Sequence, residues 1–335
     1  MMINLIILLI LVISIYFINN YFLFHKKLNN YKGDVHQKFS NQQNVPLTGG
    51  IYLVIFSMLF FYDVYGLYIL FFLGIFTLGF LSDTKIINTP KKRIIIQILI
   101  LFLFIYFSDL RINSTRLYLL DYLLSYKLFS ILFIIFCISI VINGTNFIDG
   151  VNGNVIIYYF LISIFLSLSN LKGIPQEVFF YFSIFLLSLL FLNLRNKLYL
   201  GDSGSYLLGF LFSSVLIFVF NENQTISPFF IILLLWYPCF ENLFSITRKF
   251  ITKKDPSRPD TDHFHQLMYS YLLRKYRLSL IICNNLTGLL IGIYNSIIFL
   301  IALQDINHTK HQIFLIIFSI GIYTYLYCII KKKIK

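Results

Sequence analysis

Acidic and amide side chains recur with helical spacing in residues 143–153, which read NGTNFIDGVNG. Asn146, Asp149 and Asn152 occupy every third position, so a helical turn would place their side chains on one face. Carboxylate and amide oxygens gathered in this way suit a hard cation or a nucleotide. The alternative is a turn rich in Gly and Asn, but such a turn would not require Asp149 at the same spacing.

A second acidic residue, Asp202, lies in the sequence LGDSGS directly before an apolar run. Gly201 and Gly204 allow a ligand to approach the backbone closely, and Asp202 and Ser203 are typical of the start of a helix. A helix N-terminus attracts phosphate, and a carboxylate there can hold Mg²⁺ that bridges phosphate oxygens. A plain N-cap on a membrane helix is the structural alternative.

Asp83 lies at the end of the third apolar run, shortly before a basic cluster at residues 91–93. A carboxylate at the membrane edge near cations could act as a base or as part of a phosphate site. Capping of a helix, or an ion pair with Lys85, would explain the residue as well. Taken alone, the position of Asp83 favours these structural explanations.

The polar segment 247–277 contains Arg258, Asp262, His263 and His265. The order Asp-His-Phe-His is weak support for a metal site. Cationic and hydrogen-bonding side chains could instead clamp the phosphates or the base of a nucleotide. The alternative is a solvated charged loop.

Apolar helices must position these residues. Of the 335 residues, 58% are hydrophobic and 12% are charged, whereas a soluble domain carries roughly a quarter charged residues. Apolar runs of roughly 17–25 residues can cross a bilayer, so we expect an all-α polytopic membrane bundle that forms a single domain over residues 1–335. The eleven candidate transmembrane helices cover residues 3–24, 49–64, 66–82, 94–108, 128–142, 154–170, 177–193, 204–220, 228–246, 278–303 and 311–330.

The distribution of Lys and Arg predicts the orientation of this bundle. The first apolar run lacks the basic start and the cleavage site of a signal peptide, so we expect a retained helix with its N-terminus outside. In that arrangement 22 of the 27 Lys and Arg residues lie in cytoplasmic segments, as the positive-inside rule predicts. The C-terminus and the polar segments described above are then cytoplasmic. The net charge of +13 reflects this bias and attraction to membrane lipids, and we expect no nucleic-acid partner.

Together these segments resemble the polyprenyl-phosphate N-acetylhexosamine-1-phosphate transferases, which form glycosyltransferase family 4. The family includes phospho-N-acetylmuramoyl-pentapeptide transferase and undecaprenyl-phosphate GlcNAc-1-phosphate transferase. The resemblance covers about residues 34–268, and Asn-x-x-Asp-Gly-x-Asn-Gly and Gly-Asp-Ser-Gly-Ser are its most specific parts. The five segments that carry it, in the order of the family, are residues 46–50, 79–83, 143–153, 200–205 and 259–266.

The resemblance implies a membrane enzyme whose active site faces the cytoplasm at a bacterial inner membrane. It implies transfer of an N-acetylhexosamine 1-phosphate from a UDP-sugar to undecaprenyl phosphate, with release of UMP. This reaction would begin a cell-surface polysaccharide such as that of lipopolysaccharide. Mg²⁺ is the implied cofactor, with Mn²⁺ as a substitute. A homodimer is compatible with the resemblance, while the sugar and the glycan pathway stay open.

The resemblance also implies roles for individual residues. Asp202 and Asn146 would hold Mg²⁺, and Asp149 would help to bind the nucleotide or its metal. Asp83 would orient or deprotonate the lipid phosphate. The remaining substrate-binding residues would be Asn152, Arg258, His263 and His265.

Two positions depart from the family pattern. Ser82 replaces the first of two adjacent aspartates, and Asn152 stands where many members have Asp. These changes are consistent with a subfamily, but they also leave open a catalytically inactive scaffold of the same fold. The histidine segment ends at Gln266, which argues against a muramoyl-pentapeptide substrate. A membrane transporter is the other alternative, because Glu241 lies inside an apolar run.

Overall fold

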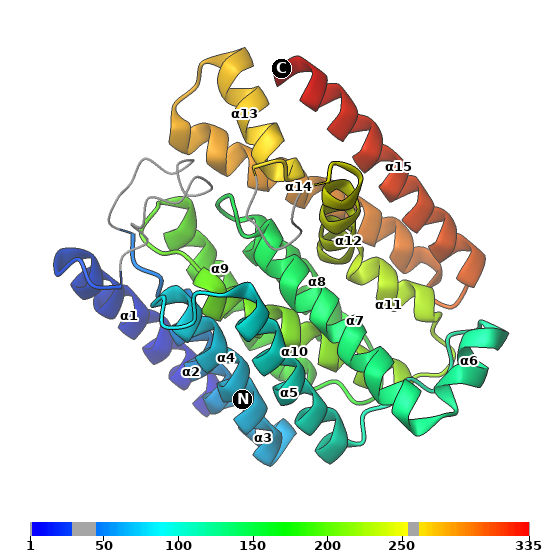
Figure 1. The fold of residues 1–335 in the computed structure, drawn as a ribbon. Helices are drawn as coiled ribbons and strands as arrows, with labels where there is room; N and C mark the ends of the chain where they lie inside the picture. Colours follow the sequence, from blue (N-terminus) through cyan, green and yellow to red (C-terminus); the bar gives the residue numbers. More distant parts are fainter. Residues whose placement is uncertain (1, 29–44, 254–260, 335) are drawn as a thin grey trace.

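The computed structural model describes residues 2–28, 45–253 and 261–334, and the predicted all-α fold is confirmed for this part of the chain (Figure 1). Short π-helical and 3-10 segments at residues 57–61 and 66–68 connect the second, third and fourth helices. The α-helices are α1 (Met2–Phe24), α2 (Gly49–Phe56), α3 (Tyr62–Tyr65), α4 (Ile69–Asp83), α5 (Pro90–Ser108), α6 (Tyr118–Leu124), α7 (Lys127–Ile148), α8 (Asn154–Leu168), α9 (Gln176–Leu194), α10 (Gly201–Glu222), α11 (Pro228–Leu234), α12 (Trp236–Ile251), α13 (Phe264–Tyr276), α14 (Leu280–Ala302) and α15 (Thr309–Ile334).

Each of the eleven predicted apolar runs forms helix, but they differ in their ability to cross a bilayer. Within the described residues, seven helices are long and apolar enough to span, or up to eight if α11 and α12 count as one. The apolar helix at residues 154–168 is shorter, and α5 carries three basic residues in its first turn. The structure therefore supports a multi-pass membrane protein, while the count of eleven crossings stays a prediction.

The predicted helix at residues 228–246 is broken. α11 and α12 meet at Leu235 with a bend of 74°. Pro238 has no backbone N–H, so it cannot donate to the carbonyl of Leu234 four residues earlier. The buried hydroxyl of Tyr158 donates to that carbonyl instead, at 2.7 Å. The bend thus has a cause in the sequence, and a neighbouring helix satisfies the exposed carbonyl.

α10 runs through the middle of the bundle (Figure 1). In its most apolar stretch, 94% of the residues are buried, and α2, α4 and α7 pack against the helix. Glycines allow this close packing, because a Cβ atom at Gly79 of α4 or at Gly50 of α2 would overlap Ser203 of α10. The first turn of α10 is therefore held between two other helices.

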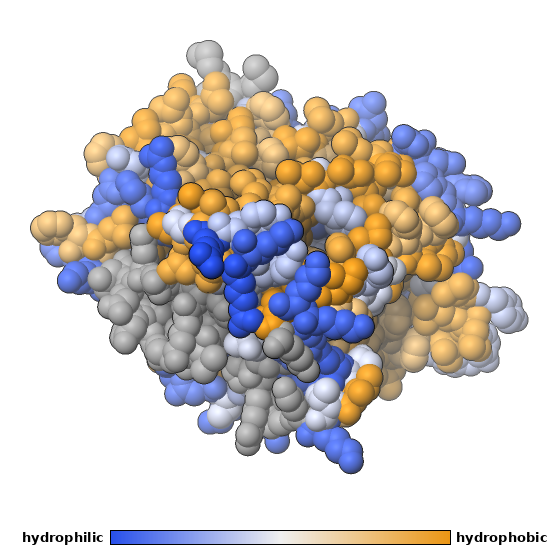
Figure 2. Space-filling view, turned by 90° about the horizontal axis from the view of Figure 1, so that it is seen from above, coloured by the Kyte–Doolittle hydropathy of each residue, from blue (hydrophilic) through white to orange (hydrophobic). Residues whose placement is uncertain are grey.

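The two ends of the bundle differ in character. In Figure 1 the C-terminal end of α15 lies beside α13 at the top of the view, and the N-terminus lies in the lower half. Figure 2 looks down on the top, where hydrophilic residues gather near the middle and hydrophobic residues border them. The ends of α4 and α7 and the start of α10 reach this upper end, so the polar sequence segments converge there.

Candidate active site

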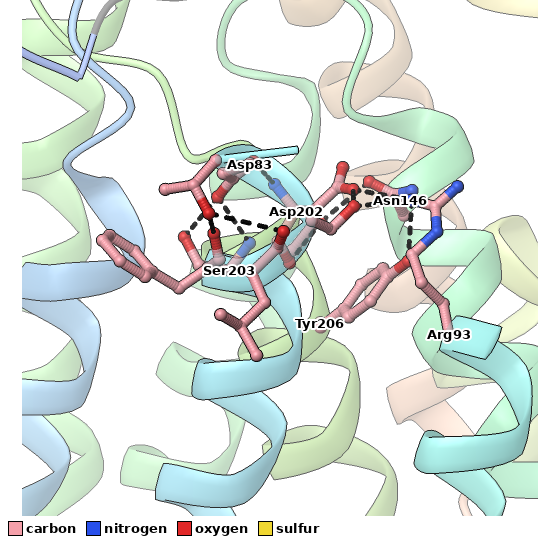
Figure 3. A network of polar contacts seen from close by, with 11 residues as sticks. Asp83, Arg93, Asn146, Asp202, Ser203 and Tyr206 are labelled. Atoms are coloured by element: carbon pink, nitrogen blue, oxygen red, sulfur yellow. Dashed lines mark hydrogen bonds and ion pairs between the residues drawn. The ribbon is translucent and has the colours of Figure 1, made fainter. Parts of the chain in front are cut away.

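The carboxylate of Asp83 lies at the N-terminus of α10 (Figure 3). Its Oδ1 accepts a hydrogen bond from the backbone N of Asp202 at 2.8 Å. Its Oδ2 accepts from the backbone N of Ser203 at 3.0 Å and from the Oγ of the same residue at 2.8 Å. The first backbone N–H groups of a helix have no partner within the helix, and the residue that precedes α10, Leu200, makes no side-chain cap. Asp83 therefore caps α10 from the end of α4.

Gly201 makes this cap possible. Its φ of +72° is in the left-handed region, which glycine adopts without strain. A Cβ atom at this position would also lie 2.7 Å from Oδ2 of Asp83. The glycine that was predicted to admit a ligand thus admits the carboxylate of a neighbouring helix.

Asp202 points away from Asp83 towards Arg93 (Figure 3). Oδ2 of Asp202 accepts hydrogen bonds from Ser82 Oγ at 2.5 Å and from Arg93 Nη1 at 2.9 Å. The same Nη1 donates to Ser82 Oγ at 2.8 Å and lies 3.5 Å from the hydroxyl of Tyr206. Sequence reasoning named the basic cluster at residues 91–93 but did not single out Arg93. Arg93 faces inward from the first turn of α5, whereas Lys91 and Lys92 on the same turn are exposed.

Asn146 and Asp149 lie at the end of α7. Oδ1 of Asn146 accepts a hydrogen bond from Ser205 Oγ at 3.1 Å, which joins α7 to α10. Asp149 is the first residue after the helix. Burial, together with the nearby charges of Asp202 and Asp83, raises the pKa of Asp149 to about 8. A bound cation would favour the ionised form of this carboxyl group.

The prediction that Asn152 shares a helical face with Asn146 and Asp149 is wrong, because α7 ends before Asn152 and the chain turns there. The buried Asn152 side chain donates to Oδ1 of Asn196 at 2.7 Å and to Oδ1 of Asn285 at 2.9 Å. Its backbone N donates to Oδ1 of Asn284 at 2.6 Å. Asn152 thus fixes the turn after α7 to the end of α9 and the start of α14, and does not share a face with Asn146.

Both predicted histidines are buried near Glu241. His263 Nδ1 lies 2.8 Å from Oε1 of Glu241, and the hydroxyl of Tyr323 donates to Oε2 at 2.5 Å. The His265 ring is fully buried, and neither of its nitrogens has a hydrogen-bond partner among the described residues. A Cβ atom at Gly150 would overlap this ring. The turn after α7 therefore packs directly on the histidine segment.

The histidine segment is also tied to the C-terminal helix. Lys331 Nζ donates to Oδ2 of Asp262 at 3.0 Å. The guanidinium of Arg248 donates to the backbone carbonyl of Asp262 and to the hydroxyl of Tyr327. Arg258, the remaining predicted substrate-binding residue, lies outside the described residues.

The donor chemistry of the site fits a hard divalent cation. No group of three His, Cys, Asp or Glu side chains within the described ranges is arranged to hold a metal ion. Mg²⁺, however, is usually bound by one or two carboxylates together with substrate phosphates and water. Asp202, Asp149 and the amide of Asn146 supply such oxygens from neighbouring ends of α7 and α10. This set suits Mg²⁺ that arrives with a phosphate-bearing substrate.

Comparison with known proteins points to one family. The family model described as glycosyl transferase family 4 matches residues 65–220. The undecaprenyl-phosphate alpha-N-acetylglucosaminyl 1-phosphate transferase of Thermotoga maritima is 27% identical over 256 residues, which are 75% of this chain and 78% of that protein. A probable undecaprenyl-phosphate N-acetylglucosaminyl 1-phosphate transferase of Bacillus subtilis is 28% identical over 146 residues, which are 42% of this chain and 40% of that protein. The matched range of the family model includes Asp83, Asp149 and Asp202 and ends before the histidine segment.

Proposed function

We propose that this chain, which belongs to glycosyl transferase family 4, transfers an N-acetylhexosamine 1-phosphate from a UDP-sugar to undecaprenyl phosphate. The names of the similar proteins from Thermotoga maritima and Bacillus subtilis support this class of reaction. UMP is the second product, and the lipid-linked sugar would begin a cell-surface polysaccharide at a bacterial inner membrane.

The reaction breaks one phosphorus–oxygen bond and forms another. An oxygen of the lipid phosphate attacks the phosphorus that carries the sugar. The bond from this phosphorus to the bridging oxygen breaks, and UMP leaves with that oxygen. Charge accumulates on phosphoryl oxygens, so catalysis depends mainly on positioning and electrostatic stabilisation.

The convergence of Asp149 and Asp202 at the meeting point of α7 and α10 carries this proposal. With Asn146 they would hold Mg²⁺, or Mn²⁺ as a substitute. The bound cation would neutralise phosphate oxygens. Asp83 is engaged by three donors from α10, which favours a positioning role over action as a base on the lipid phosphate.

The histidine segment would close the nucleotide side of the site. Glu241 holds His263 in a fixed ring orientation, and the turn at Gly150 contacts His265. Burial lowers the pKa of His265 to about 3, with His263 adding to the decrease and Glu241 opposing it. This ring is therefore neutral, so we expect it to contribute shape and hydrogen bonds rather than positive charge.

The location of the site suits two substrates of different polarity. The hydrophilic centre in Figure 2 is bordered by hydrophobic surface. A polyprenyl chain can stay in the bilayer while its phosphate reaches this end of the bundle, and a nucleotide sugar can arrive from the cytoplasm. We expect the acceptor and the donor to meet beside the first turn of α10.

The alternatives gain no specific support from the structure. Glu241, on which a transporter interpretation depended, pairs with His263 and Tyr323. Ser82 and Asn152 left a catalytically inactive scaffold open. Ser82 donates a hydrogen bond to Asp202 within the site, whereas Asn152 fixes the turn after α7. An assay of turnover separates the scaffold from the enzyme.

The test is release of UMP by purified protein from a panel of UDP-N-acetylhexosamines, with undecaprenyl phosphate and Mg²⁺. Release that requires both lipid and Mg²⁺, and that is lost in Asp202→Asn, would establish the transferase and identify its sugar. Absence of turnover with every sugar, in protein that remains folded, would refute the proposal and favour the scaffold.

A further inference from the structure

Ser82, Arg93 and Asp202 form a closed triangle of hydrogen bonds beside the proposed metal site. Figure 3 shows Arg93 and Asp202 of this triangle. Arg93 Nη1 reaches both of the other side chains, at 2.8 Å to Ser82 Oγ and 2.9 Å to Asp202 Oδ2. Because Arg is always charged, this contact is an ion pair. Arg93 therefore places a cation on a carboxylate oxygen that a metal ion would otherwise use.

The identity of residue 82 determines the direction of these hydrogen bonds. A serine hydroxyl has one hydrogen and two lone pairs. Ser82 uses its hydrogen to donate to Asp202 and a lone pair to accept from Arg93. An ionised Asp at this position could accept from Arg93 but could not donate to Asp202. Ser82 thus directs the guanidinium towards Asp202, where an Asp would compete for it.

Arg93 retains donors for another anion. Its Nε atom is buried and has no hydrogen-bond partner within the described residues. The side chain is 23% exposed, so it is not fixed in a closed core. Guanidinium groups with several free N–H bonds suit phosphate oxygens, which can accept two of them at once.

We propose that Arg93, oriented by Ser82, holds Asp202 in the metal-free protein and releases it to a divalent cation. The freed guanidinium then donates to a phosphate of the bound substrates. Arg93 thereby sets how tightly the cation binds before substrate arrives. This inference rests on the proposed function in one respect, which is that Asp202 is the metal-binding carboxylate.

The experiment measures Mn²⁺ binding to the purified, substrate-free chain by electron paramagnetic resonance. In Arg93→Gln, Mn²⁺ should bind roughly fivefold more tightly or better, because even a well-solvated unit charge a few ångströms away changes affinity by about this factor. Lys92→Gln is the matched control, since it removes an exposed charge from the neighbouring position of the same helix and should stay within about twofold of wild type. Transfer by Arg93→Gln should fall although its metal site is better occupied.

Equal Mn²⁺ affinities in wild type, Arg93→Gln and Lys92→Gln would overturn the inference. Ser82→Asp gives a second test that keeps Arg93. It should also tighten Mn²⁺ binding, because the new carboxylate draws the guanidinium away from Asp202, and an unchanged affinity would count against the proposal. Binding is read without substrate, so tighter Mn²⁺ binding in a chain without transferase activity would uphold the role of Arg93 and refute only the proposed reaction.

Discussion

Asp83 and Asp202 belong to one hydrogen-bonded network, yet their surroundings prepare them for different tasks. Asp83 accepts three hydrogen bonds from the first turn of α10, two of them from backbone N–H groups. Asp202 instead accepts from two side chains of other helices, Ser82 and Arg93. The first carboxylate therefore stabilises the helix on which the second one is carried.

These different surroundings predict that Asp83→Asn lowers the stability of the protein more than Asp202→Asn does, whereas Asp202→Asn lowers mainly its activity. In Asp83→Asn, an NH₂ group would face N–H donors, so we expect a loss of about 1–3 kcal/mol in the free energy of unfolding. Asp202→Asn loses only a partly exposed ion pair and should cost less than about 1 kcal/mol. Its transfer rate should nevertheless fall by about 100-fold or more. Thermal unfolding in detergent and the UMP assay measure the two effects, and an Asp202→Asn variant less stable than Asp83→Asn would contradict the assignment.

His265 predicts a dependence of stability on pH. Its folded-state pKa is lowered to about 3, so the unfolded chain binds the extra proton below about pH 6.5. Stability due to the neutral ring is complete above that pH and is lost as the pH falls, by up to about 2 kcal/mol at pH 5. The unfolding temperature of His265→Phe should therefore fall less steeply with acid than that of wild type.

The neighbouring groups require a control for this pH effect. His263 and Glu241 lie in the same cluster and are paired with each other. Phe147 packs against the His263 ring at 5.2 Å between centroids, and Phe147→Leu removes packing without removing a titratable group. This variant should keep the acid slope of wild type, and equal slopes for His265→Phe and wild type would remove His265 as the cause.

Part of the site can be predicted from the sequence because it lies in short motifs. Asp83, Asp149 and Asp202 stand out because they lie at the ends of apolar runs, and Asp149 and Asp202 also adjoin a glycine. Partners across the fold have no such signal, since Glu241 and His263 are 22 residues apart. Arg93 lies in a run of similar cations, and only the three-dimensional packing of α5 shows which one turns inward.

At the level of helices, glycine contacts determine how closely α2 and α4 approach α10. A Cβ atom at Gly79 would overlap the backbone of Ser203, and the backbone cannot move aside as a flexible side chain can. The same contact brings Asp83 within reach of the N–H groups of α10. Packing of α4 against α10 and capping of α10 by Asp83 therefore depend on the same contact. A substitution that disrupts the packing should disrupt the cap as well.

Gly79→Ala tests this coupling. We expect a loss of about 1–3 kcal/mol in stability from overpacking, together with reduced transfer because the cap of α10 is displaced. Gly321→Ala is the matched control, because a Cβ atom at Gly321 meets open space on α15. It should be neutral or stabilising by up to about 1 kcal/mol through helix propensity. A Gly79→Ala protein with wild-type unfolding temperature and activity would show that the contact is not required.

The helices themselves were predictable from apolar runs, whereas their interruptions were not. Pro238 lies well inside the run at residues 228–246, and hydrophobicity alone does not distinguish a tolerated proline from a 74° bend. α13 was predicted only as part of a polar loop, because its chain is amphipathic and too polar to cross a membrane. The residues at the start of α13 nevertheless determine where this helix begins, because His263 and Gln266 form a capping box.

At the scale of the whole molecule, each end of the bundle gathers segments that the sequence assigns to one side of the membrane. At the end opposite the site, Arg116 donates to the backbone carbonyls of Thr225, Ile226 and Asn307 and to the hydroxyl of Thr309. All of these residues lie in predicted outside loops. At the site end, Lys331 near the C-terminus pairs with Asp262 of the predicted cytoplasmic segment.

This agreement predicts the accessibility of cysteines introduced one at a time into a Cys328→Ser background, which lacks the exposed native cysteine and whose own labelling is the blank. Lys310→Cys lies near the Arg116 contacts and should react with a membrane-impermeant maleimide in intact spheroplasts. Lys92→Cys lies beside the site and should react only after permeabilisation, because a UDP-sugar is supplied from the cytoplasm. The reverse pattern would place the site outside and separate it from its nucleotide donor. Labelling of both positions in intact spheroplasts would show that the two ends of the bundle lie on one side of the membrane, contrary to the positive-inside distribution of Lys and Arg.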